Sequence, residues 1–303
     1  MKDSNSVPLH SRSSYDQRGN GVVYTPVAVT EVVVSQALAK LDYANASNVL
    51  EPSCGDGSFV GTLASKTSLN IYALDKNEAA IHQCRSAFDG VQFHCGDFFE
   101  DLPGDWPNHF DLIVGNPPYV SWHRCSSNTR SLLDRIGSQF DFDNKELRNT
   151  WAGFVVKATM MLSPKGVLAF VIPYEFLNVS YGKYLREWME RYFSSIDIFI
   201  PNEKAFKSID QDAVTIVASK GEGSCETVLH RVASLDTNSI QSSCKLSPGI
   251  AKSRPLEMKG FLLDGDVLNL IHKIDQRCKR ISDYCENAAG TVTAANDYFI
   301  LSK

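Results

Sequence analysis

Short, nearly continuous apolar runs alternate with stretches of helical periodicity, and this alternation constrains the fold more than any other feature of the chain. Runs without a polar face are typical of parallel strands covered by helices on both sides. The sequence therefore predicts a doubly wound α/β fold with a mostly parallel, seven-stranded sheet. Its strands are expected at residues 48–51, 71–75, 91–94, 110–114, 166–172, 195–200 and 213–218.

The same pattern divides the 303 residues into three regions. Residues 1–20 are rich in serine and charge, so we expect a disordered leader. Residues 21–220 form the α/β domain, and its first helix is expected to have Thr25 as N-cap and Pro26 as first helical residue. Residues 221–303 show weaker periodicity, and we expect them to begin a partial C-terminal domain.

Composition excludes several classes of protein. The hydrophobic share of 43% can fill a core, yet no apolar run reaches the roughly eighteen residues of a membrane span. The N-terminus also lacks the apolar stretch of a secretory signal, so we expect a cytoplasmic protein without a membrane partner. The eight cysteines show no paired metal-ligand spacing, so we predict no metal site.

The overall charge and the local charge give conflicting indications about nucleic-acid binding. The net charge of −5 argues against such a partner, because phosphate binding usually leaves a basic footprint. Between Lys245 and Arg280, however, eight Lys or Arg residues stand against four Asp or Glu residues. This local surplus keeps a nucleic-acid partner open.

Residues 51–57, Glu-Pro-Ser-Cys-Gly-Asp-Gly, stand between a predicted strand and a predicted helix. Glycines permit the sharp turn there, and the helix presents free N–H groups to a nucleotide-like cofactor. The G-x-G-x-x-G fingerprint of dinucleotide sites is incomplete, because Val60 replaces its third glycine. A carboxylate suits instead the ammonium and sulfonium charges of S-adenosylmethionine. The predicted contacts are Glu51, Pro52, Ser53, Cys54, Gly55 and Gly57.

Two further carboxylates end the next two predicted strands. Asp75, followed by Lys76, is placed to accept the ribose hydroxyls of an adenosine. Asp97 is placed to accept the adenine amine of the cofactor, with Phe98 beside the ring. These residues extend the predicted cofactor site along the rim of the sheet.

The sequence Asn116-Pro117-Pro118-Tyr119 directly follows the apolar run 110–114. Two prolines cannot continue a strand, so they fix a rigid loop at the carboxyl edge of the sheet, where open α/β folds bind ligands. The N6 amine of adenine is a poor nucleophile that needs acceptors for its N–H bonds. The Asn116 side-chain oxygen and the Pro117 carbonyl can supply them, and Tyr119 can stack on an extruded base.

Together these motifs resemble the N6-adenine DNA methyltransferases of the TaqI type, in which the cofactor motif precedes the catalytic loop and a target-recognition domain follows. The resemblance covers roughly residues 21–220. It implies that Tyr24, Thr25 and Pro26 reach the methionine moiety of S-adenosylmethionine, and that Asn116 also binds the cofactor. It also implies that Phe206 holds the flipped base against Tyr119.

The resemblance implies methyl transfer to the N6 amine of an adenine flipped from duplex DNA, by direct in-line attack, within a restriction or other defence system. Residues 21–220 are then the methyltransferase catalytic domain. Residues 221–303 then begin the target-recognition domain, with its start near 289–296, and a longer chain or a partner subunit is expected to complete the grip on DNA. Two other functions stay open: methylation of an RNA amine or a protein glutamine amide, and a non-catalytic DNA-binding subunit.

Overall fold

The computed structural model describes residues 24–202 and 212–246, together with residues 270, 273–274 and 277–279. The predicted leader and the segment 289–296 lie outside the described residues. The chain divides into two units, Met1–Lys259 and Gly260–Lys303. In the second unit, the described residues Leu270, Lys273, Ile274 and Arg277 are helical. All elements named below belong to the first unit.

A single mixed sheet of nine strands organises the described part of the first unit, in the order β3-β2-β1-β4-β5-β7-β6-β8-β9. The pairings from β3 to β5 are parallel, whereas β7 runs antiparallel to both of its neighbours. The strands are β1 (Asn48–Glu51), β2 (Asn70–Asp75), β3 (Gln92–Cys95), β4 (Phe110–Gly115), β5 (Leu162–Pro173), β6 (Ser195–Pro201), β7 (Ala213–Ser219), β8 (Glu226–Val232) and β9 (Ile240–Leu246).

The seven predicted strands are all present, but the predicted strand count and the predicted end of the sheet near Lys220 are wrong. Strand β8 pairs parallel with β6, and β9 pairs antiparallel with β8. Neither added strand has a long apolar run: β8 has only Val228 and Leu229 in succession and buries Thr227, Leu229 and Val232, and most of β9 is exposed. Backbone pairing of β8 with β6 and of β9 with β8, rather than apolar composition, makes them part of the sheet.

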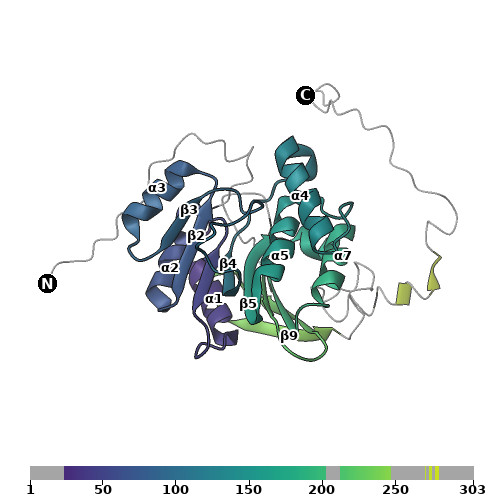
Figure 1. Ribbon diagram of the computed structural model, residues 1–303. Helices are drawn as coiled ribbons and strands as arrows, with labels where there is room; N and C mark the ends of the chain where they lie inside the picture. Colours follow the sequence, from purple (N-terminus) through teal and green to yellow (C-terminus); the bar gives the residue numbers. More distant parts are fainter. Residues whose placement is uncertain (1–23, 203–211, 247–269, 271–272, 275–276, 280–303) are drawn as a thin grey trace, which may run out of the picture. The chain divides into compact units, whose positions relative to one another are not determined.

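Helices cover both faces of the sheet (Figure 1). Figure 1 shows α1 and α2 on one side and α4, α5 and α7 on the other. The α-helices are α1 (Val27–Lys40), α2 (Ser58–Lys66), α3 (Glu78–Ala87), α4 (Ser127–Gln139), α5 (Thr150–Met161), α6 (Glu175–Asn178) and α7 (Ser180–Met189), and a short 3-10 helix, η1, spans Trp122–Arg124. None of the helices among the described residues is long and apolar enough to cross a membrane.

The main core lies between α1 and the middle of the sheet. Val33 and Val34 of α1 are fully buried in one cluster with Val167 and Val171 of β5. The helix begins at Val27, so Pro26 rather than Thr25 is its N-cap residue, and no side chain caps it. The Thr25 hydroxyl is therefore available for a contact elsewhere.

Parallel pairing brings the ends of four strands to one rim of the sheet. Glu51 pairs with Ala73 near the end of β2, and Asp75 pairs with Cys95 at the end of β3. The end of β4 leads directly into Asn116. The rim thus gathers the motifs that the sequence analysis selected.

Candidate functional site

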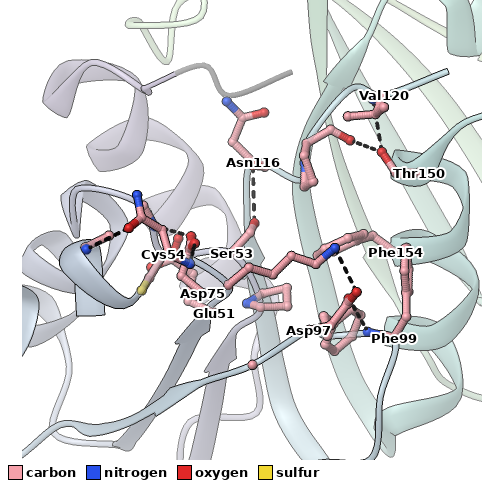
Figure 2. Close-up of a pocket in the computed structure, with 18 of the residues that line it drawn as sticks. Glu51, Ser53, Cys54, Asp75, Asp97, Phe99, Asn116, Val120, Thr150 and Phe154 are labelled. Carbon is pink, nitrogen blue, oxygen red and sulfur yellow. Dashed lines mark hydrogen bonds and ion pairs between the residues drawn. The ribbon is translucent and has the colours of Figure 1, made fainter. Parts of the chain in front are cut away.

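A pocket of about 460 Å³ opens at this rim (Figure 2). Its walls come from the loops after β1, β2, β3 and β4, and from residues of η1, α4 and α5. Figure 2 shows Glu51, Cys54 and Asp75 on one side of the pocket and Asp97 and Phe154 on the other. Several polar groups therefore converge on a concave, partly apolar surface, as in small-molecule sites.

The loop after β1 takes its shape from two glycines with left-handed backbone, Gly55 (φ +50°) and Gly57 (φ +80°). The Gly55 N–H donates to Asp75 Oδ2 at 2.9 Å. A Cβ on Gly55 would lie 3.6 Å from Tyr24 Cε1, so the tyrosine ring lies close above this glycine. A Cβ on Gly57 would lie 2.7 Å from Phe88 Cε2. Both positions therefore favour glycine for conformation, and Gly57 favours it for space as well.

Glu51 is the buried carboxylate of the pocket, with 1% of its surface exposed. Its Oε2 atom has no hydrogen-bond partner in the described part of the chain. Burial raises the pKa of Glu51 well above its ordinary value, and the nearby Asp75 and Asp56 carboxylates add to the shift. A cationic ligand group would satisfy the oxygen and restore its charge.

The other two predicted carboxylates are already engaged with the protein. Asp75 accepts the Asn77 N–H at 2.8 Å through its second oxygen. Asp97 Oδ1 accepts the Phe99 N–H at 2.9 Å, and Asp97 Oδ2 lies 2.7 Å from Lys76 Nζ. Backbone contacts thus fix both carboxylates at the rim, and the lysine bridges the ends of β2 and β3.

Asn116 joins three separate parts of the site. Its backbone carbonyl accepts from Ser53 Oγ at 3.3 Å, and its side-chain Nδ2 donates to Thr25 Oγ1 at 3.0 Å. Ser53 belongs to the loop after β1, and Thr25 precedes α1. The amide is therefore held in place by the N-terminal motif and by the predicted cofactor loop.

The rest of the Asn-Pro-Pro-Tyr loop is tied to α5 and β5. Thr150 at the start of α5 donates its hydroxyl to the Pro118 carbonyl and accepts the Val120 N–H at 3.0 Å. The Tyr119 hydroxyl donates to the Val171 carbonyl at 3.0 Å. Burial raises the pKa of Tyr119 well above its ordinary value, so this hydroxyl stays protonated.

The structure brings most of the predicted residues to one pocket. Its lining includes twelve of the predicted cofactor residues: Tyr24, Thr25, Glu51, Pro52, Ser53, Cys54, Gly55, Asp75, Lys76, Asp97, Phe98 and Asn116. Pro26 and Gly57 do not line it, and of the predicted catalytic loop Pro117 and Tyr119 do not. Phe206 lies outside the described residues.

Sequence reasoning missed the far wall of the pocket, which belongs to residues of the segment 120–154. Its members are Val120, Arg124, Cys125, Ser126, Thr129, Thr150 and Phe154. No motif marks them, because they meet the pocket through helices that follow the Asn-Pro-Pro-Tyr loop. A long polar connection directly after the loop was the one available signal.

Residues 61–206 match the family described as Eco57I restriction-modification methylase. A curated relative, the type II methyltransferase M.AccI of Acinetobacter calcoaceticus, is 28% identical over 190 residues, which cover 61% of this chain and 33% of the relative. A release factor glutamine methyltransferase of Xylella fastidiosa is 36% identical over 102 residues, covering 32% of this chain and 36% of the relative. The chain spans about a third of the length of these relatives.

The fold is also that of solved methyltransferases. A type I restriction-modification system methyltransferase subunit from Streptococcus thermophilus superposes with a TM-score of 0.58 at 18% identity, covering 71% of this chain and 48% of that one. At that identity the likeness shows the fold alone. Residues 61–206 thus match the Eco57I restriction-modification methylase family, and S-adenosylmethionine is the cofactor.

Proposed function

We propose that this chain methylates DNA as the methylase of a restriction-modification system, and that its target is the N6 amine of an adenine flipped from the duplex. The observation that carries the proposal is the position of Asn116. Its backbone is bound to Ser53 of the cofactor loop and its side chain to Thr25, so a polar amide is held at the rim of the cofactor pocket. The similarity to M.AccI supports DNA as the substrate.

The residues of the pocket fit the cofactor. The buried Glu51 carboxylate, with one oxygen lacking a partner among the described residues, suits the ammonium of the methionine moiety. Asp75 and Asp97 suit the ribose hydroxyls and the adenine amine, and Phe98 and Phe154 supply aromatic surface. S-adenosylmethionine, when bound, supplies a methyl group activated by the adjacent sulfonium.

The catalytic loop offers acceptors for an amine. The backbone carbonyls of its first three residues differ. The Asn116 carbonyl accepts from Ser53 and the Pro118 carbonyl from Thr150, whereas the Pro117 carbonyl has no hydrogen bond within the described residues. The Pro117 carbonyl and the Asn116 side-chain oxygen are thus our candidates to hold the two N–H bonds of the target amine. Acceptors that are already oriented need no reorganisation during the reaction.

Tyr119 and Phe206 are our candidates to stack on the flipped base. The Tyr119 hydroxyl is bound to the Val171 carbonyl, which fixes the plane of the ring. Direct in-line transfer needs no enzyme nucleophile. Consistent with this, burial raises the pKa of the pocket thiol Cys125, which disfavours its reactive thiolate.

Methyl transfer from tritiated S-adenosylmethionine tests the substrate. The purified chain is incubated separately with duplex DNA, RNA and a bacterial release factor, and incorporated label is counted for each. The proposal expects label in DNA alone, and it expects Asn116→Ala to abolish the signal with cofactor affinity retained. Label confined to RNA or to the release factor would overturn the DNA assignment.

A second candidate substrate is the side-chain amide of a protein glutamine. The 36% identity to a release factor glutamine methyltransferase favours it, and both amides and aromatic amines need acceptors for N–H bonds. In the assay above, label in the release factor rather than in DNA supports this candidate. A DNA-binding subunit without catalysis would bind cofactor and label no substrate.

We also propose that a target-recognition domain follows the sheet. Because β8 and β9 continue the sheet to Leu246, that domain would begin after Leu246 rather than at residue 221. The boundary between compact units at Lys259 and Gly260 supports a start near residue 260. Limited proteolysis checks this: the expected first cut lies between residues 247 and 260.

A further inference from the structure

The loop after β3, residues 97–100, turns three consecutive backbone carbonyls toward cationic side chains. Lys157 of α5 donates to the Phe98 carbonyl and to the Glu100 carbonyl, both at 2.6 Å. Arg135 of α4 donates to the Phe99 carbonyl between them at 2.8 Å. No sequence motif joins these residues, which lie 36 to 59 positions apart along the chain.

The opposite side of this loop faces the cofactor pocket. Asp97 and Phe98 line it, and the Asp97 carboxylate is oriented by the Phe99 N–H. Lys157 Nζ also lies 5.0 Å from the centre of the Phe98 ring, which packs on Phe154 at a centroid distance of 4.9 Å. Lys157 does not itself line the pocket; it contacts Phe98, which directly follows Asp97, and the Glu100 carbonyl of the same loop.

Charge makes these contacts strong. Burial lowers the pKa of Lys157 to about 8, while Asp101, Asp97 and Glu100 oppose that shift. The ammonium thus remains largely charged at neutral pH, and charged donors form the stronger hydrogen bonds to carbonyls. Without it, the Phe98 and Glu100 carbonyls would lose this donor, and the loop would have to turn to find water.

We propose that Lys157 is a positioning residue for the adenine subsite: it acts through the loop 97–100 to hold Asp97 where a carboxylate can accept the exocyclic amine of adenine. It does not touch the cofactor. The inference rests on the cofactor site described above and adds a specificity determinant to it. Lys157 thereby couples recognition of the 6-amino group to α5, the helix whose first residue, Thr150, also holds the catalytic loop.

A pair of ligands separates positioning from general stability. S-adenosylhomocysteine carries the 6-amino group, and S-inosylhomocysteine carries a carbonyl oxygen there, which an Asp97 carboxylate would repel. Wild-type protein should prefer the amino ligand by about tenfold or more in calorimetric titration. Lys157→Met should weaken S-adenosylhomocysteine binding by about tenfold and bring the preference close to one. Lys157→Arg should retain most of the affinity for S-adenosylhomocysteine and most of the preference for the amino ligand.

Lys220 supplies a matched control. It is also a partly buried lysine that donates to a backbone carbonyl, that of Leu162 at 3.0 Å, and burial lowers its pKa, but Leu162, unlike Phe98, does not line the pocket. Lys220→Met should lower the thermal unfolding midpoint and leave both affinities unchanged. An equal loss of ligand preference in Lys220→Met would overturn the proposal.

Wild-type affinity and preference in Lys157→Met would also overturn it. If that variant does not fold by circular dichroism, Lys157→Gln, which keeps N–H donors without the charge, replaces it. An intermediate loss of preference is then expected, and an unchanged preference contradicts the proposal. Failure of the wild-type chain to bind S-adenosylhomocysteine would overturn the cofactor site itself, and this inference with it, whereas absence of DNA methylation would leave these binding results intact.

Discussion

Lys76 Nζ lies 2.7 Å from Asp97 Oδ2 across the ends of two neighbouring strands. Since Asp97 Oδ1 already accepts the Phe99 N–H, both oxygens of this carboxylate are engaged. An adenine amine that binds Asp97 through Oδ2 must share that oxygen with the lysine or displace it. Lys76 therefore competes with the cofactor for the Asp97 carboxylate. More than half of the Lys76 side chain is exposed.

We predict that Lys76→Met tightens binding of S-adenosylhomocysteine. A partly exposed ion pair contributes about 0–1 kcal/mol, so the gain should reach up to about fivefold. Calorimetric titration at low and high salt checks this, because salt should raise the wild-type affinity and leave the variant unchanged. Lys66→Met, at an exposed lysine outside the pocket, is the control, and weaker binding by Lys76→Met would contradict the competition.

Cofactor binding should release a proton from Glu51. Burial raises its pKa in the free protein, and an ammonium placed beside it would lower that pKa again. Affinity for S-adenosylhomocysteine should therefore rise with pH, up to the raised pKa of the free protein. Titrations in buffers of different ionisation enthalpy measure the proton directly. Glu51→Gln should bind S-adenosylhomocysteine weakly at every pH and release no proton from this position on binding.

The same residue should make the free protein less stable at higher pH. Folding raises the pKa of Glu51, so its contribution to stability is fully present below the ordinary glutamate pKa, where the carboxyl is protonated. This contribution is lost as the pH rises through the folded-state pKa. Glu51→Gln should therefore increase the free energy of unfolding at neutral pH while it weakens cofactor binding. Urea unfolding of the wild-type protein and Glu51→Gln at acidic and at neutral pH checks this. If the variant is less stable than wild type by the same amount at the two pH values, the prediction is contradicted.

Gly57→Ala should damage the cofactor loop more than conformation alone predicts. Its φ of +80° costs an alanine about 1–2 kcal/mol, and its Cβ would meet Phe88 Cε2 at 2.7 Å and Cys84 Sγ at 3.0 Å. Gly90→Ala is the matched control, since Gly90 has φ +76° and open space around it. Thermal unfolding should show the larger loss for Gly57→Ala, and that variant alone should lose cofactor affinity.

The ring of Tyr119, rather than its hydroxyl, should matter for catalysis. Tyr119→Phe removes the bond to the Val171 carbonyl and should cost about 1 kcal/mol of stability with most activity retained. Tyr119→Ala removes stacking worth about 1–3 kcal/mol, so kcat/KM for DNA should fall about tenfold to a hundredfold. Equal activity of the two variants would argue against stacking on the base.

Local patterns predicted the strands and loops that bear the pocket, because each depends on residues adjacent in sequence. Apolar runs marked the first seven strands, and glycines and prolines marked the loops at their ends. The last two strands escaped prediction because β9 is mostly exposed and β8 has no apolar run longer than two residues. Their place in the sheet depends on the pairing of β8 with β6 and of β9 with β8, which no local pattern encodes.

The pocket wall formed by α4 and α5 could not be predicted for a related reason. Lys157 and Arg135 bind backbone carbonyls, and a carbonyl carries no sequence signature at either partner. The same holds for Thr150 and the Pro118 carbonyl. Thr25 was expected to cap α1, but Pro26 is the N-cap residue. The Thr25 hydroxyl instead accepts a hydrogen bond from the side-chain N–H of Asn116.

The central claim is that Asn116 holds the N6 amine of adenine during methyl transfer. Its most direct test is mass spectrometry of nucleosides from plasmid DNA incubated with the protein and S-adenosylmethionine carrying a deuterated methyl group. The wild-type chain should give deuterated N6-methyladenine, and Asn116→Ala should give none while S-adenosylhomocysteine still binds. Labelled methylcytosine in place of methyladenine, or an active Asn116→Ala variant, would contradict the account.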